Sequence, residues 1–338
     1  MSDATGTIQL AHGGGGRLTR ELIEQEIVPR FGAGPLRGLP DAASLPPSSA
    51  RIIFTTDGFV VQPLEFPGGD IGDLAVYGTV NDISVSGGVP KWLSLGLILE
   101  EGLEIAMLRR ILDSVKRAAD SCGVVVATGD TKVVAHGQCD GLYINTAGIG
   151  EALPEFVLGV DRISPGDAVL VSGPLADHGM AVVSARQNIA IVNGPRSDTG
   201  PLHRLVNSMR PLGTAVRFMR DPTRGGAASV LNEIVEGRPF GAILDETAIP
   251  LSDGTRAAAE MLGLDPLHVP SEGRVIAICA NDAVDEVLAG WRALPEGAGC
   301  ARIGTITSRD AGRVIIDTLA GGRRVVDVPR GELLPRIC

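Results

Sequence analysis

The stretch "IGDLAVYGTVNDISVSGGVPKWLSLGLILEEG", residues 71–102, contains two different apolar patterns in succession. Residues 71–88 predict a helix that stops at a glycine pair, and residues 91–102 predict a strand. Asp82 lies inside the otherwise apolar helix. A helix followed closely by an apolar strand indicates an α/β protein rather than an all-helical or an all-β one.

The same alternation continues on both sides of this stretch. Residues 51–56 and 141–150 predict strands, residues 103–123 predict a helix closed by Gly123, and "VVVATGD" predicts a strand that runs into a polar turn. The pattern breaks at 151–166, and a second series follows. We expect strands near 168–173, 241–246, 274–280, 301–306, 313–317 and 323–328, and helices near 176–190, 201–218, 225–237, 252–263 and 281–292.

Strands and helices do not alternate one for one, so mixed sheets are favoured over a doubly wound sheet. The fold class is therefore α/β (α+β), with two domains of mixed sheets and packed helices and an extended C-terminal tail. We expect four segments: residues 1–50 with a Gly-rich loop, a domain at 51–155, a domain at 156–328, and a mobile tail at 329–338.

Composition excludes several classes of function. The net charge of -10 and the lack of a basic stripe argue against nucleic-acid binding. No run of eighteen apolar residues predicts a membrane span, and the N-terminal residues do not resemble a signal peptide. Five cysteines without a CxxC pair argue against a disulfide framework or a zinc site and favour a reducing cytoplasm.

The run "AHGGGGR", which contains His12, Gly14 and Gly15, offers backbone N–H groups that can approach an anion. A flexible N-terminal turn is an equally good interpretation. No Gly-Lys pair occurs, so a Walker A loop is excluded. Lys132, in "TGDTKVVAHG", is a candidate functional cation in a chain whose basic residues are mostly arginine; the alternative is an ordinary exposed lysine.

Three aspartates form a candidate metal set: Asp57, Asp82 and Asp130. Asp57 and Asp130 follow apolar strands, and a buried carboxylate needs a partner. Mg²⁺ shared with phosphate groups would serve all three. Singly, each is better explained by helix capping or turn formation; as a set they favour metal and nucleotide binding.

Two segments of the second half are also candidates. In "RDPTRGG", residues 220–226, Thr223, Arg224 and the following glycine amides would form an anion site at a helix N-terminus, and the alternative is an ordinary capped helix start. In "VPSEGR", Glu272 lies in a turn where a carboxylate could act as a base, although the signal is weak alone. The chain ends in "PRIC", and Cys338 is either an incidental thiol or a carrier on a movable arm.

Together these segments resemble the HypE family, the carbamoyl dehydratases of NiFe-hydrogenase maturation, within the PurM-like (AIR-synthetase-like) ATP-binding superfamily. The resemblance covers nearly the whole chain and leaves only 31–50 and 281–330 generic. Its most specific mark is the terminal "PRIC". The other segments are "HGGGG", "TTDGFVVQPLEFPGGDIG", "GTVNDISVSGG", "ILEEGL", "TGDTKVV", "NTAGIG", "LVSGPLADHGMAV", "DPTRGG" and "SEG".

The resemblance implies a particular reaction and particular partners. Cys338 receives a carbamoyl group from the carbamoyltransferase HypF, and ATP-dependent dehydration converts the S-carboxamide to a thiocyanate. The cyanide then passes to iron held by a HypC–HypD complex. A homodimer is implied, with ATP in a groove around the paired N-terminal domains.

The resemblance also implies site residues. Mg²⁺ is expected on Asp57, Asp82 and Asp130, and proton handling on Glu272, Lys132 or His136, in that order of preference; Lys132 is alternatively a phosphate ligand. The ATP-binding set is His12, Gly14, Gly15, Asp57, Asn81, Asp82, Asp130, Thr131, Lys132, Asn145, Thr223 and Arg224.

Two alternatives remain. A related ATP-dependent enzyme such as selenophosphate synthetase would carry a reactive cysteine or selenocysteine near the N-terminal glycines, whereas the first cysteine here is Cys122. AIR synthetase and thiamine-phosphate kinase give no reason for a terminal thiol. A non-enzymatic thiol carrier or metallochaperone would use Cys338 as a ligand, but one thiol without a nearby His or Cys makes a poor metal site.

Overall fold

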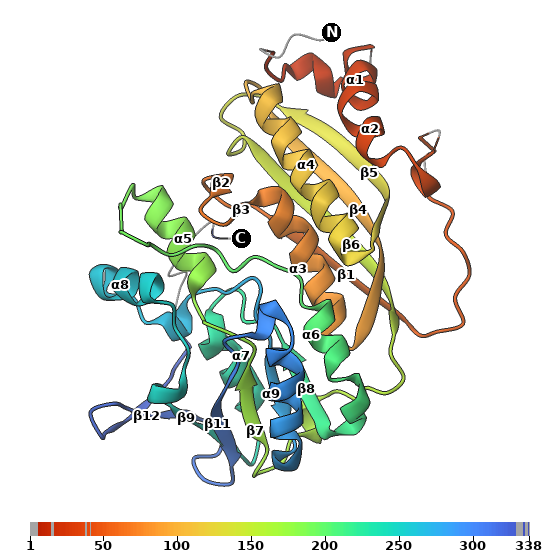
Figure 1. Ribbon diagram of the computed structural model, residues 1–338. Helices are drawn as coiled ribbons and strands as arrows, with labels where there is room; N and C mark the ends of the chain where they lie inside the picture. The colour runs from red at the N-terminus through yellow and green to blue at the C-terminus, as the bar shows by residue number, and fades with distance from the viewer. Residues whose placement is uncertain are drawn as a thin grey trace.

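The computed structural model describes residues 6–14, 17–37, 39–40, 42–328, 334 and 337. The chain forms two α/β parts, one above the other in Figure 1, and each part is built on one main sheet. The predicted fold class, mixed sheets with packed helices, is confirmed. The domain boundaries of the sequence analysis stay a prediction.

The N-terminal sheet has the strand order β1-β6-β4-β5. Strand β6 is antiparallel to both β1 and β4, and β5 is parallel to β4. The strands are β1 (Ile52–Phe59), β4 (Gly88–Glu100), β5 (Val125–Val134) and β6 (Leu142–Ala152); β2 (Glu65–Phe66) and β3 (Gly69–Asp70) form a separate small ribbon.

Two helices pack on this sheet, α3 (Ile71–Val85) and α4 (Ile105–Cys122), and they lie side by side in Figure 1. Helix α3 is apolar on nearly all sides because it contacts the sheet, α4 and the C-terminal part. Its N-terminus is capped by Asp70, whose carboxylate accepts from two backbone N–H groups. Helix α4 ends at Gly123, which has a left-handed conformation with φ of 65°.

Two strands of this region extend further than predicted. Strand β1 continues through Asp57 to Phe59, and β5 continues through Asp130 to Val134. Both aspartates therefore lie within strands, where pairing with β6 and β4 satisfies their backbone groups. The polar residues are tolerated because both strands are sheet edges with one accessible side.

The N-terminal segment forms a nearly continuous helical run beside β5 (Figure 1). It comprises the 3₁₀ turn η1 (Leu10–Gly13), α1 (Arg17–Leu22), the π-helical turn η2 (Ile23–Ile27) and α2 (Val28–Phe31). Leu22 and Phe31 are buried in the same core as the sheet. The segment therefore adds a wall to the N-terminal part.

The C-terminal sheet has seven strands in the order β13-β12-β9-β11-β7-β10-β8, and only β12 and β9 are parallel. Its central strands are buried on both faces, since α7 covers one face and α6 and α9 cover the other. The strands are β7 (Ala168–Val171), β8 (Val216–Arg220), β9 (Gly241–Asp245), β10 (Ile276–Cys279), β11 (Ala301–Thr307), β12 (Val314–Asp317) and β13 (Arg323–Val325).

The helices of the C-terminal part are α5 (Asp177–Arg186), α6 (His203–Ser208), α7 (Gly226–Val235), α8 (Asp253–Leu262) and α9 (Val284–Arg292). The helix predicted at 201–218 is wrong in its second half. Pro211 and Gly213 interrupt it with a 3₁₀ segment, and residues 216–220 form the edge strand β8. None of the described helices is both long and apolar enough to cross a membrane.

Candidate active site

Acidic side chains from both parts of the chain lie close together beside one groove. Asp57 of β1, Asp82 of α3 and Asp221, which follows β8, lie close enough for their charges to act on one another. Thr55 Oγ1 donates a hydrogen bond of 2.9 Å to Asp82 Oδ2. Thr55, Asp82 and Asp221 line a groove of about 460 Å³ that also contains Arg220.

These carboxyl groups hold protons more tightly than usual. Burial raises the pKa of Asp82, and the charge of Asp57 raises it further against the hydrogen bond from Thr55. Burial and then Asp82 raise the pKa of Asp221 to about 7. Like charges crowded in this way are stabilised by a bound cation.

Glu272, in the turn before β10, is the most buried acid of the group, with 2 % of its surface exposed. Its Oε1 atom has no hydrogen-bond partner among the described residues. Burial raises the pKa of Glu272 well above its usual range, and the charges of Asp221, Asp198 and Asp57 add to this effect, while Arg224 opposes it. A buried carboxyl group with an unpartnered oxygen is typical of an acid or base in a reaction.

The turn of Glu272 is held by the loop that contains Asp198. The backbone N–H of Glu272 donates to Asp198 Oδ1 at 3.1 Å, and Arg274 Nε lies 3.4 Å from Asp198 Oδ2. This packing requires a glycine at position 273 of "SEG", because a Cβ atom there would collide with the Asp198 carbonyl. The position of Glu272 therefore depends on the loop at 197–199.

Asn81 ties α3 to the same turn. Its Nδ2 donates to the carbonyl oxygens of Gly200 at 3.0 Å and of Glu272 at 3.1 Å, and its Oδ1 accepts from the N–H of Leu202 at 2.8 Å. Both amide donors are used, so Asn81 has no donor left for a nucleotide. The expected nucleotide contact of Asn81 stays a prediction, and the structure gives it a clamping role.

The "DPTRGG" segment reaches the same groove. Helix α7 begins at Gly226, whose N–H donates to the carbonyl of Thr223 at 2.8 Å. Arg224 is near enough for its charge to lower the pKa of Asp57 and to act on Glu272. The predicted cation of this segment thus lies beside the acidic group.

Asn145 lies on β6, next to β1. Its Nδ2 donates to the Asp57 carbonyl oxygen at 2.8 Å, and a longer bond of 3.5 Å reaches Thr56 Oγ1. Asn145 therefore supports the strand that carries Asp57. Its predicted contact with a nucleotide is not tested by these bonds.

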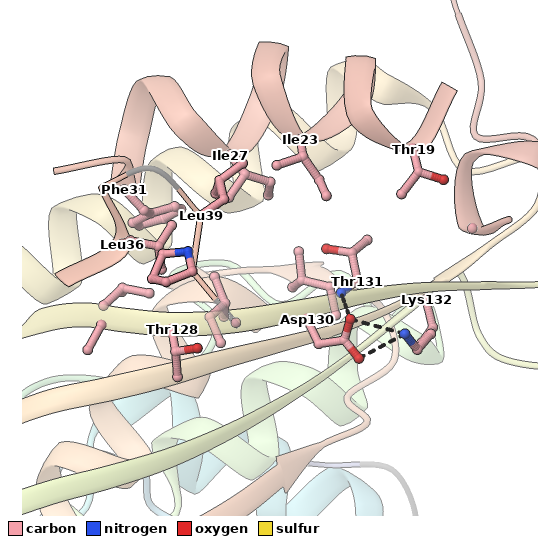
Figure 2. Close-up of a pocket in the computed structure, with 17 residues that line it drawn as sticks. Thr19, Ile23, Ile27, Phe31, Leu36, Leu39, Thr128, Asp130, Thr131 and Lys132 are labelled. Atoms are coloured by element: carbon pink, nitrogen blue, oxygen red, sulfur yellow. Dashed lines mark hydrogen bonds and ion pairs between the residues drawn. The ribbon is translucent and has the colours of Figure 1, made fainter. Parts of the chain in front are cut away.

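The "GDTK" residues lie at a different place, a pocket of about 320 Å³ between β5 and the N-terminal helical segment. Figure 2 shows Thr19, Ile23, Ile27 and Phe31 on one side of the pocket and Asp130, Thr131 and Lys132 on the other. The pocket is apolar at one end and charged at the other, which suits a ligand with a flat apolar part and an anionic part.

At the charged end, Asp130 and Lys132 form an exposed ion pair. Lys132 Nζ lies 3.0 Å from Asp130 Oδ2 and 3.1 Å from Oδ1, and the N–H of Thr131 donates to Oδ1 at 2.9 Å. About two thirds of each charged side chain is exposed. An exposed pair of this kind is weakly held, so both groups are free to bind a ligand.

The N-terminal glycine run lies against the same strand. A Cβ atom at Gly13 would come within 2.7 Å of Val133, so only glycine allows η1 to approach β5 this closely. His12 Nδ1 accepts from the N–H of Gln9 at 2.9 Å, and Gly14 is the C-cap residue of η1. The structure thus brings His12 and Gly14 together with the "GDTK" strand. Gly15 lies outside the described residues.

The three aspartates do not form one metal site within a single chain. Asp130, Gly96, Asn145 and Gly58 are in register across all four strands, from β5 to β1. Three strand spacings separate Asp130 from the Asp57 edge by roughly 14 Å, whereas ligands of one Mg²⁺ lie within about 2.1 Å of it. Accordingly, the described part of the chain contains no group of three His, Cys, Asp or Glu side chains able to hold a metal.

His136, the last candidate base, lies on an exposed turn after β5. Its side chain is 85 % exposed, and its Nδ1 atom lies 3.4 Å from Glu100 Oε1. Glu100 also accepts from the backbone N–H groups of Gly137 and Gly141. His136 therefore helps Glu100 to hold this turn, and the structure does not bring His136 close to Glu272.

Sequence reasoning missed His178 of α5. His178 Nε2 lies 2.7 Å from the carbonyl oxygen of Ile337, and Nδ1 lies 2.9 Å from Ser197 Oγ. Ile337 is 3 % exposed and belongs to the N-terminal core. The available signal was a histidine within the helix predicted near 176–190. Cys338 itself lies outside the described residues.

Comparison with known proteins identifies this architecture. The N-terminal domain of AIR synthase related proteins matches residues 40–152, and the C-terminal domain matches residues 164–317. A crystal structure of hydrogenase maturation protein HypE in complex with ATP superimposes with a TM-score of 0.93 at 41% identity, over 98% of this chain and 100% of that one. Fold and site therefore define a two-domain protein of the AIR-synthase-related class.

The more specific relationship comes from the curated relatives. Carbamoyl dehydratase HypE of Rhodobacter capsulatus is 45% identical over 98% of both chains. The crystal structure of a HypE–HypF complex matches with a TM-score of 0.80 at 40% identity, over 91% of this chain and 99% of that one. The chain belongs to the HypE family of carbamoyl dehydratases.

Proposed function

We propose that this chain dehydrates a carbamoyl group, carried as an S-carboxamide on Cys338, to a thiocyanate at the expense of ATP. The product supplies the cyanide ligand for the iron of NiFe-hydrogenase. The observation that carries the proposal is Glu272, a buried acid with an unpartnered oxygen, in a turn held by the loop that also holds His178 and, through it, Ile337.

The overall reaction balances as R–S–CO–NH₂ plus ATP giving R–S–CN, ADP and phosphate. ATP supplies the phosphoryl group that turns the amide oxygen into a good leaving group, because hydroxide leaves poorly. The amide nitrogen must lose both protons as the triple bond forms, so the site needs a base.

Glu272 is the preferred base. Burial and the neighbouring carboxylates raise its pKa, which makes the ionised carboxylate a stronger base than an exposed glutamate. Arg224 counteracts this effect and stabilises the ionised form. Lys132 is better suited to hold phosphate, because it is exposed at the mouth of the pocket beside β5.

The acidic residues fit Mg²⁺. Burial raises the pKa of both Asp57 and Asp82, the charge of Asp57 raises that of Asp82 further, and their oxygen atoms are the ligands that Mg²⁺ prefers. When bound, Mg²⁺ would neutralise phosphate charge. In this proposal, Asp130 is contributed by a second copy of the chain, because one chain keeps it at the opposite sheet edge.

The proposed assembly is accordingly a homodimer. Strands β1 and β5 are both unpaired sheet edges, and Ile52, Phe54 and Val125 are exposed along them. A HypF-type carbamoyltransferase is the proposed donor partner, as in the HypE–HypF complex. A HypC–HypD complex is the proposed cyanide acceptor, and the cytoplasm is the proposed compartment.

Mass spectrometry of the intact chain tests the reaction. Incubation with HypF, carbamoyl phosphate and ATP should add one carbamoyl group, and the mass of one water should then be lost when Mg²⁺ and ATP are present. Cys338→Ala should bind ATP but show neither change. Normal modification of that variant would contradict the assignment of Cys338 as carrier.

A further inference from the structure

Two described residues near the end of the chain, Leu334 and Ile337, pack against other parts of the chain. Ile337 is buried among residues of the N-terminal core, and Leu334 packs against both that core and the cluster of α5 and α8. His178 of α5 contacts Phe66 of β2 edge to face, with ring centroids 5.3 Å apart. These contacts therefore fix apolar side chains of the tail and also one of its backbone carbonyls.

The contact of His178 with the tail has a defined direction. A carbonyl oxygen can only accept, so Nε2 carries the proton and donates to the Ile337 carbonyl. Complete burial lowers the pKa of His178 to about 4, so the ring is neutral and Nδ1 must accept. Ser197 Oγ, at 2.9 Å, is its nearest donor.

A second hydroxyl fixes Ser197 in turn. Thr199 Oγ1 lies 2.6 Å from Ser197 Oγ, and the N–H of Thr199 donates to the same oxygen at 3.0 Å. Between the two hydroxyl residues lies Asp198, which accepts from the N–H of Glu272. The three-residue loop thus holds His178 on one side and the turn of Glu272 on the other.

We propose that His178 is the latch that docks the C-terminal segment, and that it acts as a positioning residue for the reaction at Cys338. The carbonyl that it holds belongs to the peptide bond joining Ile337 to Cys338. This hydrogen bond favours the docked state of Ile337, and its loss favours release of the carrier end to a partner. The inference rests on the proposed function for its catalytic consequence, but the docking itself does not depend on it.

The first test measures docking in the full-length chain without ATP or partner. A maleimide labels the protein, and the rate is read on the C-terminal peptide by mass spectrometry. His178→Leu removes the donor and should raise the rate about three- to tenfold, the worth of one hydrogen bond. His178→Gln keeps an N–H donor and should restore slow labelling. An unchanged rate in His178→Leu, or equal rates in both variants, would overturn the proposal.

Two further variants keep the test decisive. Ser197→Ala leaves the imidazole in place and removes its orienting donor, so it should give a smaller rise even if His178→Leu does not fold. His268→Leu is the matched control, because His268 Nε2 also donates to a backbone carbonyl, that of Asp327, at 2.8 Å. If His268→Leu raised the labelling rate as much as His178→Leu, the cause would be a general loosening of the fold. That result would overturn the proposal that His178 is the latch.

The second test separates the latch from the proposed reaction. In His178→Leu, carbamoylation by HypF should stay at least as fast as in the parent protein. Dehydration should slow by about tenfold in this variant and recover in His178→Gln. A merely structural defect would slow both steps. If the carbamoylated parent protein is never dehydrated, the proposed function fails. The labelling experiment still decides whether His178 holds the tail.

Discussion

Asn81 Nδ2 donates a 3.1 Å hydrogen bond to the backbone carbonyl of Glu272. Helix α3, which also carries Asp82, is thereby fixed to the turn that carries the preferred base. The two residues are 191 positions apart in sequence and come from the two parts of the chain. This bond makes the geometry of the acidic groove depend on how the two parts are joined.

Asn81→Leu should therefore lower both the stability of the fold and the rate of dehydration per folded chain. The variant loses three hydrogen bonds in a fully buried position and leaves three backbone groups unsatisfied. We expect the free energy of unfolding to fall by about 2–4 kcal/mol. Urea denaturation measures the first effect, and dehydration per folded chain measures the second.

Asn232→Leu provides the control. Asn232 Nδ2 also bridges two backbone carbonyls, those of Ala228 and Val326, but both lie within the C-terminal part. This variant should lose stability and keep its dehydration rate per folded chain. A similar loss of rate in both variants would show that Asn81 has no special connection with Glu272.

Asp82→Asn should weaken the binding of Mg-ATP while the fold survives. The substitution removes one charge from a crowded group, so it should lower the pKa of Asp221, which Asp82 raises. Without nucleotide, the variant should be at least as stable as the parent. Calorimetry measures the affinity, with the exposed Asp113→Asn as control. Unchanged Mg-ATP affinity would remove Asp82 from the metal site.

Asp73, in the first turn of α3, predicts a pH dependence of stability. Burial and then the charge of Asp70 raise its pKa from 3.8 to about 6. The folded state therefore binds a proton more tightly than the unfolded state. This contribution is complete below about pH 4 and is lost as the pH rises through about 6.

Asp73→Asn should abolish that part of the pH profile. From pH 4 to 7, the parent should lose about 1–2 kcal/mol more stability than the variant. Chemical denaturation at several pH values measures the difference. Parallel profiles would show that Asp73 titrates normally. The test is independent of the reaction, because Asp73 lies at the opposite end of α3 from Asp82.

Much of the fold could be predicted because its patterns are local. Helix α4 has a clear apolar face and a glycine stop, and α7 begins at its glycine pair. Sheet order is not local. Strand β6 is the last of its sheet in sequence but lies between β1 and β4. Asp57 and Asp130 therefore look equivalent in sequence and lie at opposite edges.

The candidate site could be predicted only in part from the sequence. Glu272 was a weak candidate by sequence because nothing local shows that its turn is buried against the loop of Asp198. His178 was missed because its partner, Ile337, is 159 residues away. Long-range contacts of this kind depend on tertiary packing and have no signature in a short window.

Glu272 and Lys132 should fail in different ways when they are replaced. Glu272→Gln keeps the shape of the side chain and removes the base, so the S-carboxamide should form and accumulate while ATP still binds. Lys132→Met removes an exposed cation beside the pocket at β5, so it should weaken ATP binding and leave the buried acid intact.

Two measurements on each variant separate the roles: calorimetry with ATP, and the mass of the chain after carbamoylation. We expect dehydration in Glu272→Gln to fall at least about 100-fold, the usual worth of a general base. For Lys132→Met, high ATP concentration should restore much of the rate, because the defect is in binding. Restoration of Glu272→Gln by ATP would reverse the two assignments, since the acid would then serve the nucleotide and the lysine would be the remaining candidate for proton transfer.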